Sequence, residues 1–163
     1  QGEALALSHE IAVMHEGRIQ QIGSPRDIYE RPATQFVADF VGTSNFINGT
    51  VIGSESAPDG CVVVRTEIGD VTVRALQDLV ADERVAVSVR PEDVDLTEIR
   101  PAGGNVWEGR VDQKVFLGEA VDFQVKVGAR TLLSRRHPTL RTKIGDAIFV
   151  QLDPEKCVVL KVA

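Results

Sequence analysis

The chain has 163 residues, of which 43% are hydrophobic and 26% charged, and its formal net charge is −6. This composition is that of an ordinary globular protein and excludes disordered and fibrous classes. Its acidic balance argues against a dedicated nucleic-acid binder, because such proteins are usually basic. No apolar run approaches the ~20 residues of a membrane-spanning helix. Cys61 and Cys157 form no CxxC pair for a structural zinc site.

Residues 1–42 predict a short α/β segment that differs in pattern from the rest of the chain. Leu5 and Leu7 lie on the apolar face of a helical pattern with no capping residue before it, so we expect the chain to be a piece of a longer protein. The stretches IAVM and RIQQI then predict two short strands around the turn at His15-Glu16-Gly17.

Two helices are expected next. Ser24 is the expected N-cap of the first, with Pro25 at its first position and an end before Pro32. The second is expected over residues 34–41, and Gly42 provides its C-terminal stop.

After Gly42 the chain consists of short, Val-rich segments in which apolar and polar residues alternate. They are separated by Gly, Asp or Pro, and read NFINGTVIG, CVVVRTEIG, VTVRAL, RVAVSVR, WEGRVDQKVFLG, VDFQVKVG, RTLLSR, AIFVQL and CVVLKV. This pattern predicts a mainly β fold, a small antiparallel barrel or sandwich. Residues 77–84 are expected to form a loop or a short helix, and residues 101–105 (PAGGN) to link two halves.

A weak internal repeat has a spacing of about sixty residues. Residues 49–51 resemble residues 109–111, and VSVRPEDVDL resembles VQLDPEKCVVL, which aligns Pro91 with Pro154. Val-rich strands resemble one another easily, so chance and duplication both explain the match. A duplication predicts two OB-like β units of one plan.

No residue is singled out as catalytic, cofactor-binding or metal-binding. His9-Glu10 resembles half of an HExxH zinc helix, but Val13 stands where the second histidine is required. The histidines are therefore interpreted as surface or locally bonded residues. No GxSxG and no GxxxxGK[ST] phosphate loop occurs in the sequence.

Residues 130–143 (RTLLSRRHPTLRTK) are the one basic anomaly in this acidic chain. A surface for an anion or a partner protein and a solvated strand face are the two interpretations. An oligonucleotide is disfavoured, because no aromatic residues interleave for stacking. The basic residues of this candidate anion patch are Arg130, Arg135, Arg136, Arg141 and Lys143.

The RPED sequence at residues 90–93 follows a predicted strand. Pro91 removes a backbone donor, so the strand is expected to end or bulge there. Arg90 is able to pair with Glu92 or Asp93. A turn with exposed charges and a regulatory or subunit contact are both compatible with this pattern.

These segments together resemble a known family. QGEALALSHEIAVMHEGRIQQIGSPRDIYERPATQFVADFVG resembles the end of the ATPase subunit of ABC importers, and GTSNFINGTV continues into its OB-like C-terminal region, called TOBE. VSVRPEDVDL resembles the strand-RPE element of that region, and GEAVDFQVKVG the strand pair near its end. The resemblance divides the chain into a remnant of the nucleotide-binding domain with linker helices (1–42) and a TOBE/OB-like regulatory domain (43–163).

The resemblance implies a regulatory and dimerisation module. In this family the ATPase subunits work in pairs whose C-terminal regions touch across the two-fold axis, and some members bind a small effector there. The implied partners are a second copy of the chain and, through the missing domain, the membrane subunits of the transporter. The implied location is cytoplasmic, peripheral on the inner face of the cell membrane. Polyamine, ferric-iron and sugar importers are the similar groups, which leaves the solute open.

The same resemblance places the ATP and Mg²⁺ sites before Gln1. We therefore expect no cofactor in this chain and no ATP hydrolysis by it. We also expect Leu5, Leu7, Ile11 and Val13 to lack the partners they would have in the whole domain, and the first twenty or so residues to be poorly ordered or repacked.

A contact between copies, or with an effector, is expected at two places. One is Arg90-Pro91-Glu92, and the other is Phe116-Leu117-Gly118, where two apolar residues precede a glycine. A position in the barrel core is the other interpretation of Phe116. A symmetric dimer needs one self-complementary patch.

Two other functions stay open at this stage. One is an OB-type binder of a small oxyanion that uses the basic residues of 130–143. The other is an oligonucleotide-binding OB-fold, which the acidic charge and the 5% aromatic content disfavour.

Overall fold

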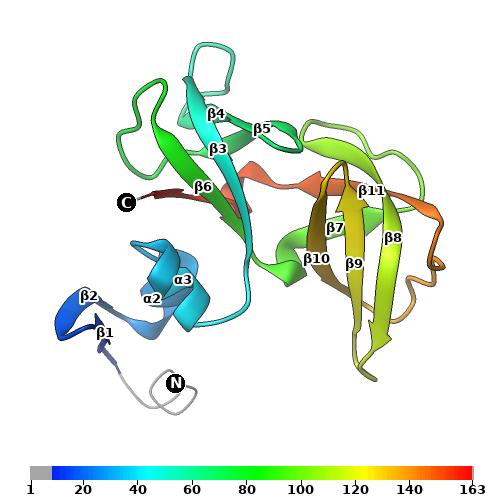
Figure 1. Ribbon diagram of the computed structural model, residues 1–163, viewed down its shortest axis with the longest axis horizontal. Coiled ribbons are helices and arrows are strands. Elements are labelled where there is room, and N and C mark those ends of the chain that lie inside the picture. Colours follow the sequence, from blue (N-terminus) through cyan, green and yellow to red (C-terminus); the bar gives the residue numbers. More distant parts are fainter. Residues whose placement is uncertain (1–8, 163) are drawn as a thin grey trace.

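The computed structural model describes residues 9–162. The N-terminal segment begins with a hairpin of two antiparallel strands. Two short helices follow it and lie near β3 (Asn45–Gly53) and β6 (Arg84–Val89) of the larger β-sheet that comes next in the chain (Figure 1). The elements of the segment are β1 (Ile11–His15), β2 (Arg18–Gly23), α2 (Pro25–Glu30) and α3 (Gln35–Phe40).

The first helix begins where the sequence predicted, and the second begins one residue later than predicted, because Thr34 is its N-cap. The Ser24 hydroxyl accepts a hydrogen bond from the Asp27 backbone N–H at 3.1 Å, and Pro25 is the first helical residue. The Thr34 hydroxyl accepts one from the Val37 N–H at 3.2 Å. Each cap satisfies a backbone donor that the first helical turn leaves without a partner.

The N-terminal segment has a small core of its own. Val13, Ile28 and Val37 are buried together, and Ile11 packs against them. Ile11 and Val13 thus have partners within this chain, because α2 and α3 cover one face of the hairpin. That they lack the partners they would have in a whole ATP-binding domain stays a prediction. The other apolar side chains of the hairpin lack cover, since Met14, Ile19 and Ile22 are each more than half exposed. Leu5 and Leu7, and the helical pattern around them, lie outside the described residues.

The rest of the chain is mainly β, as predicted. Residues 75–83 form a loop, and residues 101–105 link two halves of the same plan. The first half contains β3 (Asn45–Gly53), β4 (Cys61–Thr66), β5 (Gly69–Arg74), β6 (Arg84–Val89), the 3₁₀ turn η1 (Pro91–Asp93) and β7 (Val94–Thr97). The second contains β8 (Val106–Phe116), β9 (Val121–Val127), β10 (Arg130–Arg136), β11 (Ala147–Leu152), the 3₁₀ turn η2 (Pro154–Lys156) and β12 (Val158–Lys161).

The halves exchange their last strands. One sheet has the order β12-β6-β3-β4-β5 and the other β7-β11-β8-β9-β10, so the strand after η1 joins the second sheet and the strand after η2 joins the first. The two orders are equivalent, strand for strand. This arrangement confirms that the chain contains two related β units.

The repeated residues also occupy equivalent places. A Cβ on Gly49 would lie 2.6 Å from the Arg65 carbonyl oxygen, and one on Gly109 would lie 2.7 Å from that of Lys126. Both distances are too short for any side chain, so each glycine allows the neighbouring strand to approach closely. The register also shifts just after each glycine, following Val51 in one unit and Val111 in the other.

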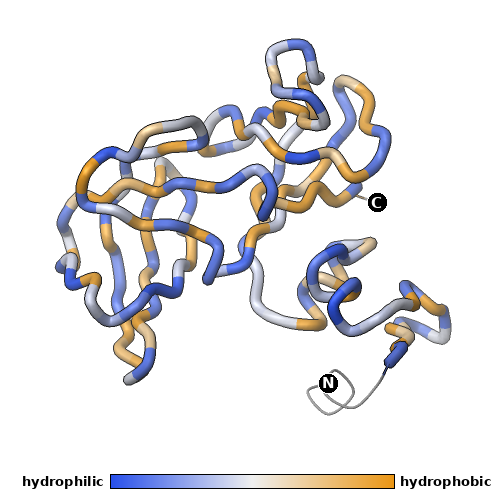
Figure 2. The backbone as a smooth tube through the Cα atoms, turned by 180° about the vertical axis from the view of Figure 1, so that it is seen from behind, coloured by the Kyte–Doolittle hydropathy of each residue, from blue (hydrophilic) through white to orange (hydrophobic). Residues whose placement is uncertain are grey.

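One hydrophobic core joins the two units. It runs from Ile47 and Val64 in the first to Phe123 and Ile148 in the second, all fully buried. Along the strands, hydrophilic and hydrophobic residues alternate, so each strand presents one face to this core (Figure 2). Within residues 9–162, no helix has the length and apolar character needed to cross a bilayer.

Candidate functional site

Arg90 joins the N-terminal segment to the β units. It lies at the end of β6, is only 7% exposed, and its Nη1 donates to the carbonyl oxygens of Gly42 at 2.7 Å and Ala38 at 3.0 Å. Those oxygens lie at the end of α3, where backbone acceptors have no helical partner. A guanidinium is suited to this task because it offers several donors in a fixed plane.

Tyr29 is the second member of this contact. The Arg90 guanidinium lies over its ring, 4.5 Å from the centroid, and the Tyr29 hydroxyl donates a hydrogen bond to Glu92. Burial and the bond to the Glu92 carboxylate raise the Tyr29 pKa to about 12. Tyr29, Arg90 and Glu92 thus connect α2 to the β6–η1 turn.

The RPED element therefore makes contacts within the chain. Arg90 and Pro91 are buried, and Glu92 is the exposed residue of the three. The predicted contact with another copy or an effector stays a prediction here, and Glu92 is the side chain available for it. Burial raises the pKa of the adjacent Asp93 carboxyl, which lies 3.6 Å from the Lys156 ammonium.

Two of the five basic residues of 130–143 are bound to acids, and the candidate anion patch stays a prediction. Arg135 makes two hydrogen bonds to the Asp122 carboxylate, at 2.7 and 3.0 Å. These bonds raise the pKa of the Arg135 guanidinium. Arg136 pairs with Asp95 at 2.9 Å and also donates to the Glu92 backbone carbonyl. Their charges are thus matched by nearby acids.

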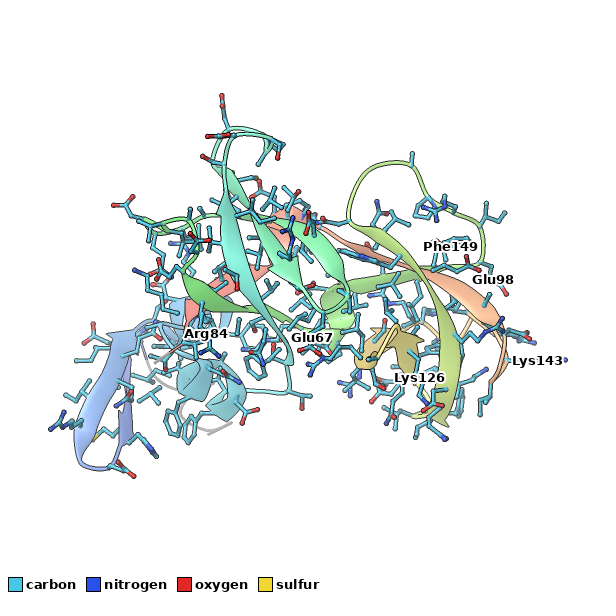
Figure 3. The ribbon with its side chains drawn as sticks, turned by 45° about the horizontal axis from the view of Figure 1, so that its top comes forward. Glu67, Arg84, Glu98, Lys126, Lys143 and Phe149 are labelled. Carbon is cyan, nitrogen blue, oxygen red and sulfur yellow. The ribbon has the colours of Figure 1, made fainter. Side chains whose placement is uncertain are left out.

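The other three basic residues differ from these. Arg130 donates to the Phe46 carbonyl, and its Nε is buried with no hydrogen-bond partner within the described part of the chain. Arg141 and Lys143 are exposed and make no ion pair with any described residue. Lys143 extends from the outer end of the second unit (Figure 3).

The hairpin between β8 and β9 exposes an apolar tip, which consists of Val115, Phe116 and Leu117. Their exposed fractions are 53%, 71% and 51%. Phe116 is thus a surface residue, and the interpretation that placed it in the barrel core was wrong, because it is the last residue of β8 and its side chain at this end of the strand is exposed. Gly118 follows in the left-handed conformation, with a φ of 85°, which suits the tight turn.

The equivalent hairpin of the first unit, between β3 and β4, has no such tip. Its loop reads SESAPD over residues 54–59 and contains no large apolar side chain. The fold therefore does not require apolar residues at this place. Exposed apolar side chains that folding does not require are typical of contact surfaces.

Sequence reasoning did not single out Tyr29, Asn45 and Asn105. Tyr29 is the only tyrosine of the chain. Its contact with Glu92 could not be predicted from a local pattern, because the two residues are distant in sequence. The two asparagines are sixty positions apart, one at the start of β3 and one just before β8, so the repeat itself was the available signal.

The comparisons agree with this architecture. A sequence model of the TOBE domain matches residues 87–160. The spermidine/putrescine import ATP-binding protein PotA of Frankia alni is 38% identical to this chain over 98% of it and 37% of its own length. PotA 1 of Pseudomonas aeruginosa is also 38% identical, over 98% of this chain and 43% of its own. The chain thus spans about two fifths of the length of these relatives.

A solved structure shares the fold. The cytoplasmic molybdate-binding protein ModG, with molybdate bound, matches 73% of this chain and 96% of its own with a TM-score of 0.63, at 17% identity. The fold is therefore that of a TOBE/OB-like β domain. The chain contains a TOBE domain and is similar, over 98% of its length, to ATP-binding subunits of ABC importers, which confirms the resemblance seen in the sequence.

Proposed function

We propose that this chain is the regulatory and dimerisation region of an ABC-importer subunit, which couples ATP hydrolysis in the rest of the protein to solute uptake. The observation that carries the proposal is the similarity to PotA proteins over 98% of the chain. Residues 1–42 act as the end of the ATP-binding domain with its linker helices, and residues 43–163 as the regulatory domain. The Arg90 contact connects these two parts.

The partners follow from this role. They are a second copy of the chain and the membrane subunits of the transporter, at the cytoplasmic face of the membrane. The relatives named as spermidine/putrescine importers favour a polyamine as the solute. ATP and Mg²⁺ bind outside these 163 residues, so the chain hydrolyses no ATP. Turnover of Mg·ATP by the purified chain would overturn this part of the proposal.

The tip of Val115, Phe116 and Leu117 is the dimer contact of the proposal. Burying these side chains against a second copy removes apolar surface from water, which stabilises association. Sedimentation equilibrium of the purified chain is expected to show a concentration-dependent dimer. Phe116→Asp should weaken it by about tenfold or more, because it places a charge in the contact.

The matched control is Val80→Asp, at an apolar residue that is 67% exposed and belongs to the loop between β5 and β6 of the first unit. It should leave the dissociation constant unchanged. A chain that stays monomeric at all concentrations, or a dimer that tolerates Phe116→Asp, would contradict the tip as the contact.

Oxyanion binding is the second candidate. It is supported by Arg141 and Lys143, which make no ion pair with a described residue, and by the molybdate that the ModG structure contains. Calorimetric titration with molybdate, sulfate and phosphate tests it. Binding that is lost in Arg141→Gln would favour this function, and no heat with any of the three anions would rule it out.

A further inference from the structure

A cavity of about 560 Å³ lies where the N-terminal segment meets the two β units. One wall is the end of α2 (29–32), and the others are the end of β5, the β6–η1 turn and the η2–β12 turn. The volume is within the range of ~300–1,000 Å³ that is usual for small-molecule sites. A ligand there would contact all three parts of the chain.

The polar side chains on the floor of the cavity already have hydrogen-bond partners. Ser88, Arg90 and Cys157 are buried there, and the Arg90 guanidinium is used by the α3 carbonyls and the Tyr29 ring. The Ser88 hydroxyl lies 2.6 Å from that of Ser44. These groups shape the cavity, but the polar partners of a ligand have to come from its rim.

Two ion pairs neutralise much of the charged rim. Arg74 Nε lies 3.2 Å from a Glu155 carboxylate oxygen, and Lys156 Nζ lies 3.6 Å from one of Asp93. Both pairs connect η2 to the first β unit. The Glu30 carboxylate, at the end of α2, pairs with Arg26 at 2.8 Å. These charges have partners before any ligand arrives.

Two charged residues of the cavity lining have no ion-pair partner among the described residues. Arg31 at the end of α2 and Glu92 in η1 make no ion pair with any residue from 9 to 162. Glu92 accepts one hydrogen bond from Tyr29, which leaves further acceptor capacity on its carboxylate. The cavity therefore offers one unpaired cation and one unpaired anion, on walls that come from different parts of the chain.

The charges of the lining select for a ligand that has both signs. An anion such as phosphate would pair with Arg31 but also meet the Glu92 carboxylate, and a polycation would pair with Glu92 but also meet the Arg31 guanidinium. Like charges brought together in a site disfavour the wrong partner. A molecule with one carboxylate and one ammonium group offers an oppositely charged partner to each of Arg31 and Glu92.

We infer that this cavity is a binding site for a small zwitterion of the amino-acid class, with its carboxylate at Arg31 and its ammonium group at Glu92. This inference goes beyond the proposed function and does not depend on it. A bound ligand would bridge α2 and η1, the elements that Tyr29 and Glu92 already connect.

The test uses the whole chain and two single-sign probes. Each of the twenty common L-amino acids, spermidine and inorganic phosphate is added separately, and the thermal midpoint and the binding heat are measured. At least one amino acid is expected to bind, and to raise the midpoint more than spermidine or phosphate at equal concentration. Failure of all twenty to bind, or an equal effect of either single-sign probe, would overturn the inference.

Variants then locate the site. Arg31→Gln and Glu92→Gln should each weaken the binding of that amino acid by about tenfold or more, the effect of losing one charge-assisted hydrogen bond. Glu92→Gln keeps an acceptor for Tyr29, so the fold is retained. Arg18→Gln and Glu67→Gln are the matched controls, since both residues are exposed and outside the cavity. Unchanged affinity in both cavity variants would overturn the assignment.

Discussion

Asn45 and Asn105 are equivalent residues that connect the two β units in opposite directions. The Asn45 side chain accepts from the Leu133 N–H at 2.8 Å and donates to the Leu133 carbonyl at 2.8 Å. The Asn105 side chain does the same with the Thr72 backbone, at 2.9 and 2.7 Å. Each amide thus pairs with an edge strand as a neighbouring strand would, β10 in one case and β5 in the other.

Replacement of Asn45 tests this contact. Asn45→Ala leaves the Leu133 N–H and carbonyl without their partner, so a loss of about 2–4 kcal/mol in the free energy of unfolding is expected. Urea unfolding measures it. Asn48→Ala, at an exposed position of the same strand, should change the stability by less than about 0.5 kcal/mol. Equal losses in the two variants would show that the contact contributes nothing specific.

The two glycines at which a neighbouring strand approaches closely provide a second prediction. Gly49→Ala and Gly109→Ala each place a methyl group within 3.0 Å of a neighbouring backbone oxygen. The strands have to separate, and each change is expected to cost about 2 kcal/mol or more in unfolding free energy. Gly104→Ala is the control, because a Cβ there meets nothing within 4 Å. Tolerance of either strand substitution would contradict the close approach.

Arg90 provides a third prediction. Arg90→Lys keeps the charge but cannot reproduce the fork of donors, so buried carbonyls of α3 and the linker lose partners. We expect a loss of about 2–3 kcal/mol, and earlier proteolysis between residues 40 and 45. Mass spectrometry of limited digests measures the site of cleavage. Arg65→Lys, on an exposed ion pair, should leave the digestion pattern unchanged.

Local patterns in the sequence were sufficient to predict the elements. Ser24 and Pro25 mark a helix start because capping involves only residues a few positions apart, and the Val-rich alternation marks strands for the same reason. The approximate repeat indicated the two units. The exchange of β7 and β12 between the sheets was not predictable, because no local pattern determines which sheet a strand joins.

The site was less predictable than the fold. An arginine next to a proline at a strand end is usually exposed, and only the tertiary structure places Arg90 against Ala38 and Gly42. Arg135 and Arg136 read as free charges in the sequence, but their acids, Asp122 and Asp95, come from other strands. Such contacts depend on which residues the topology brings together, and no local pattern encodes that.

The last prediction concerns pH and the buried thiol of Cys157. Burial, with smaller contributions from the charges of Asp153 and Asp93, raises its pKa from near 9 to about 12. The folded state therefore holds this proton more tightly than the unfolded state. The resulting stability is fully present below pH 9 and is lost as the pH rises from about 9 to 12, at up to about 1.4 kcal/mol per pH unit.

Cys157→Ala removes this titration and should flatten the decline in unfolding free energy between about pH 9 and 11. The Tyr29 pKa is raised in the same direction, to about 12, so some decline remains in the variant and should be smaller in Cys157→Ala combined with Tyr29→Phe. Urea unfolding at several pH values measures both slopes. An identical slope in the parent chain and in Cys157→Ala would show that the thiol is not buried as the structure describes, because a solvated thiol would titrate alike in both states.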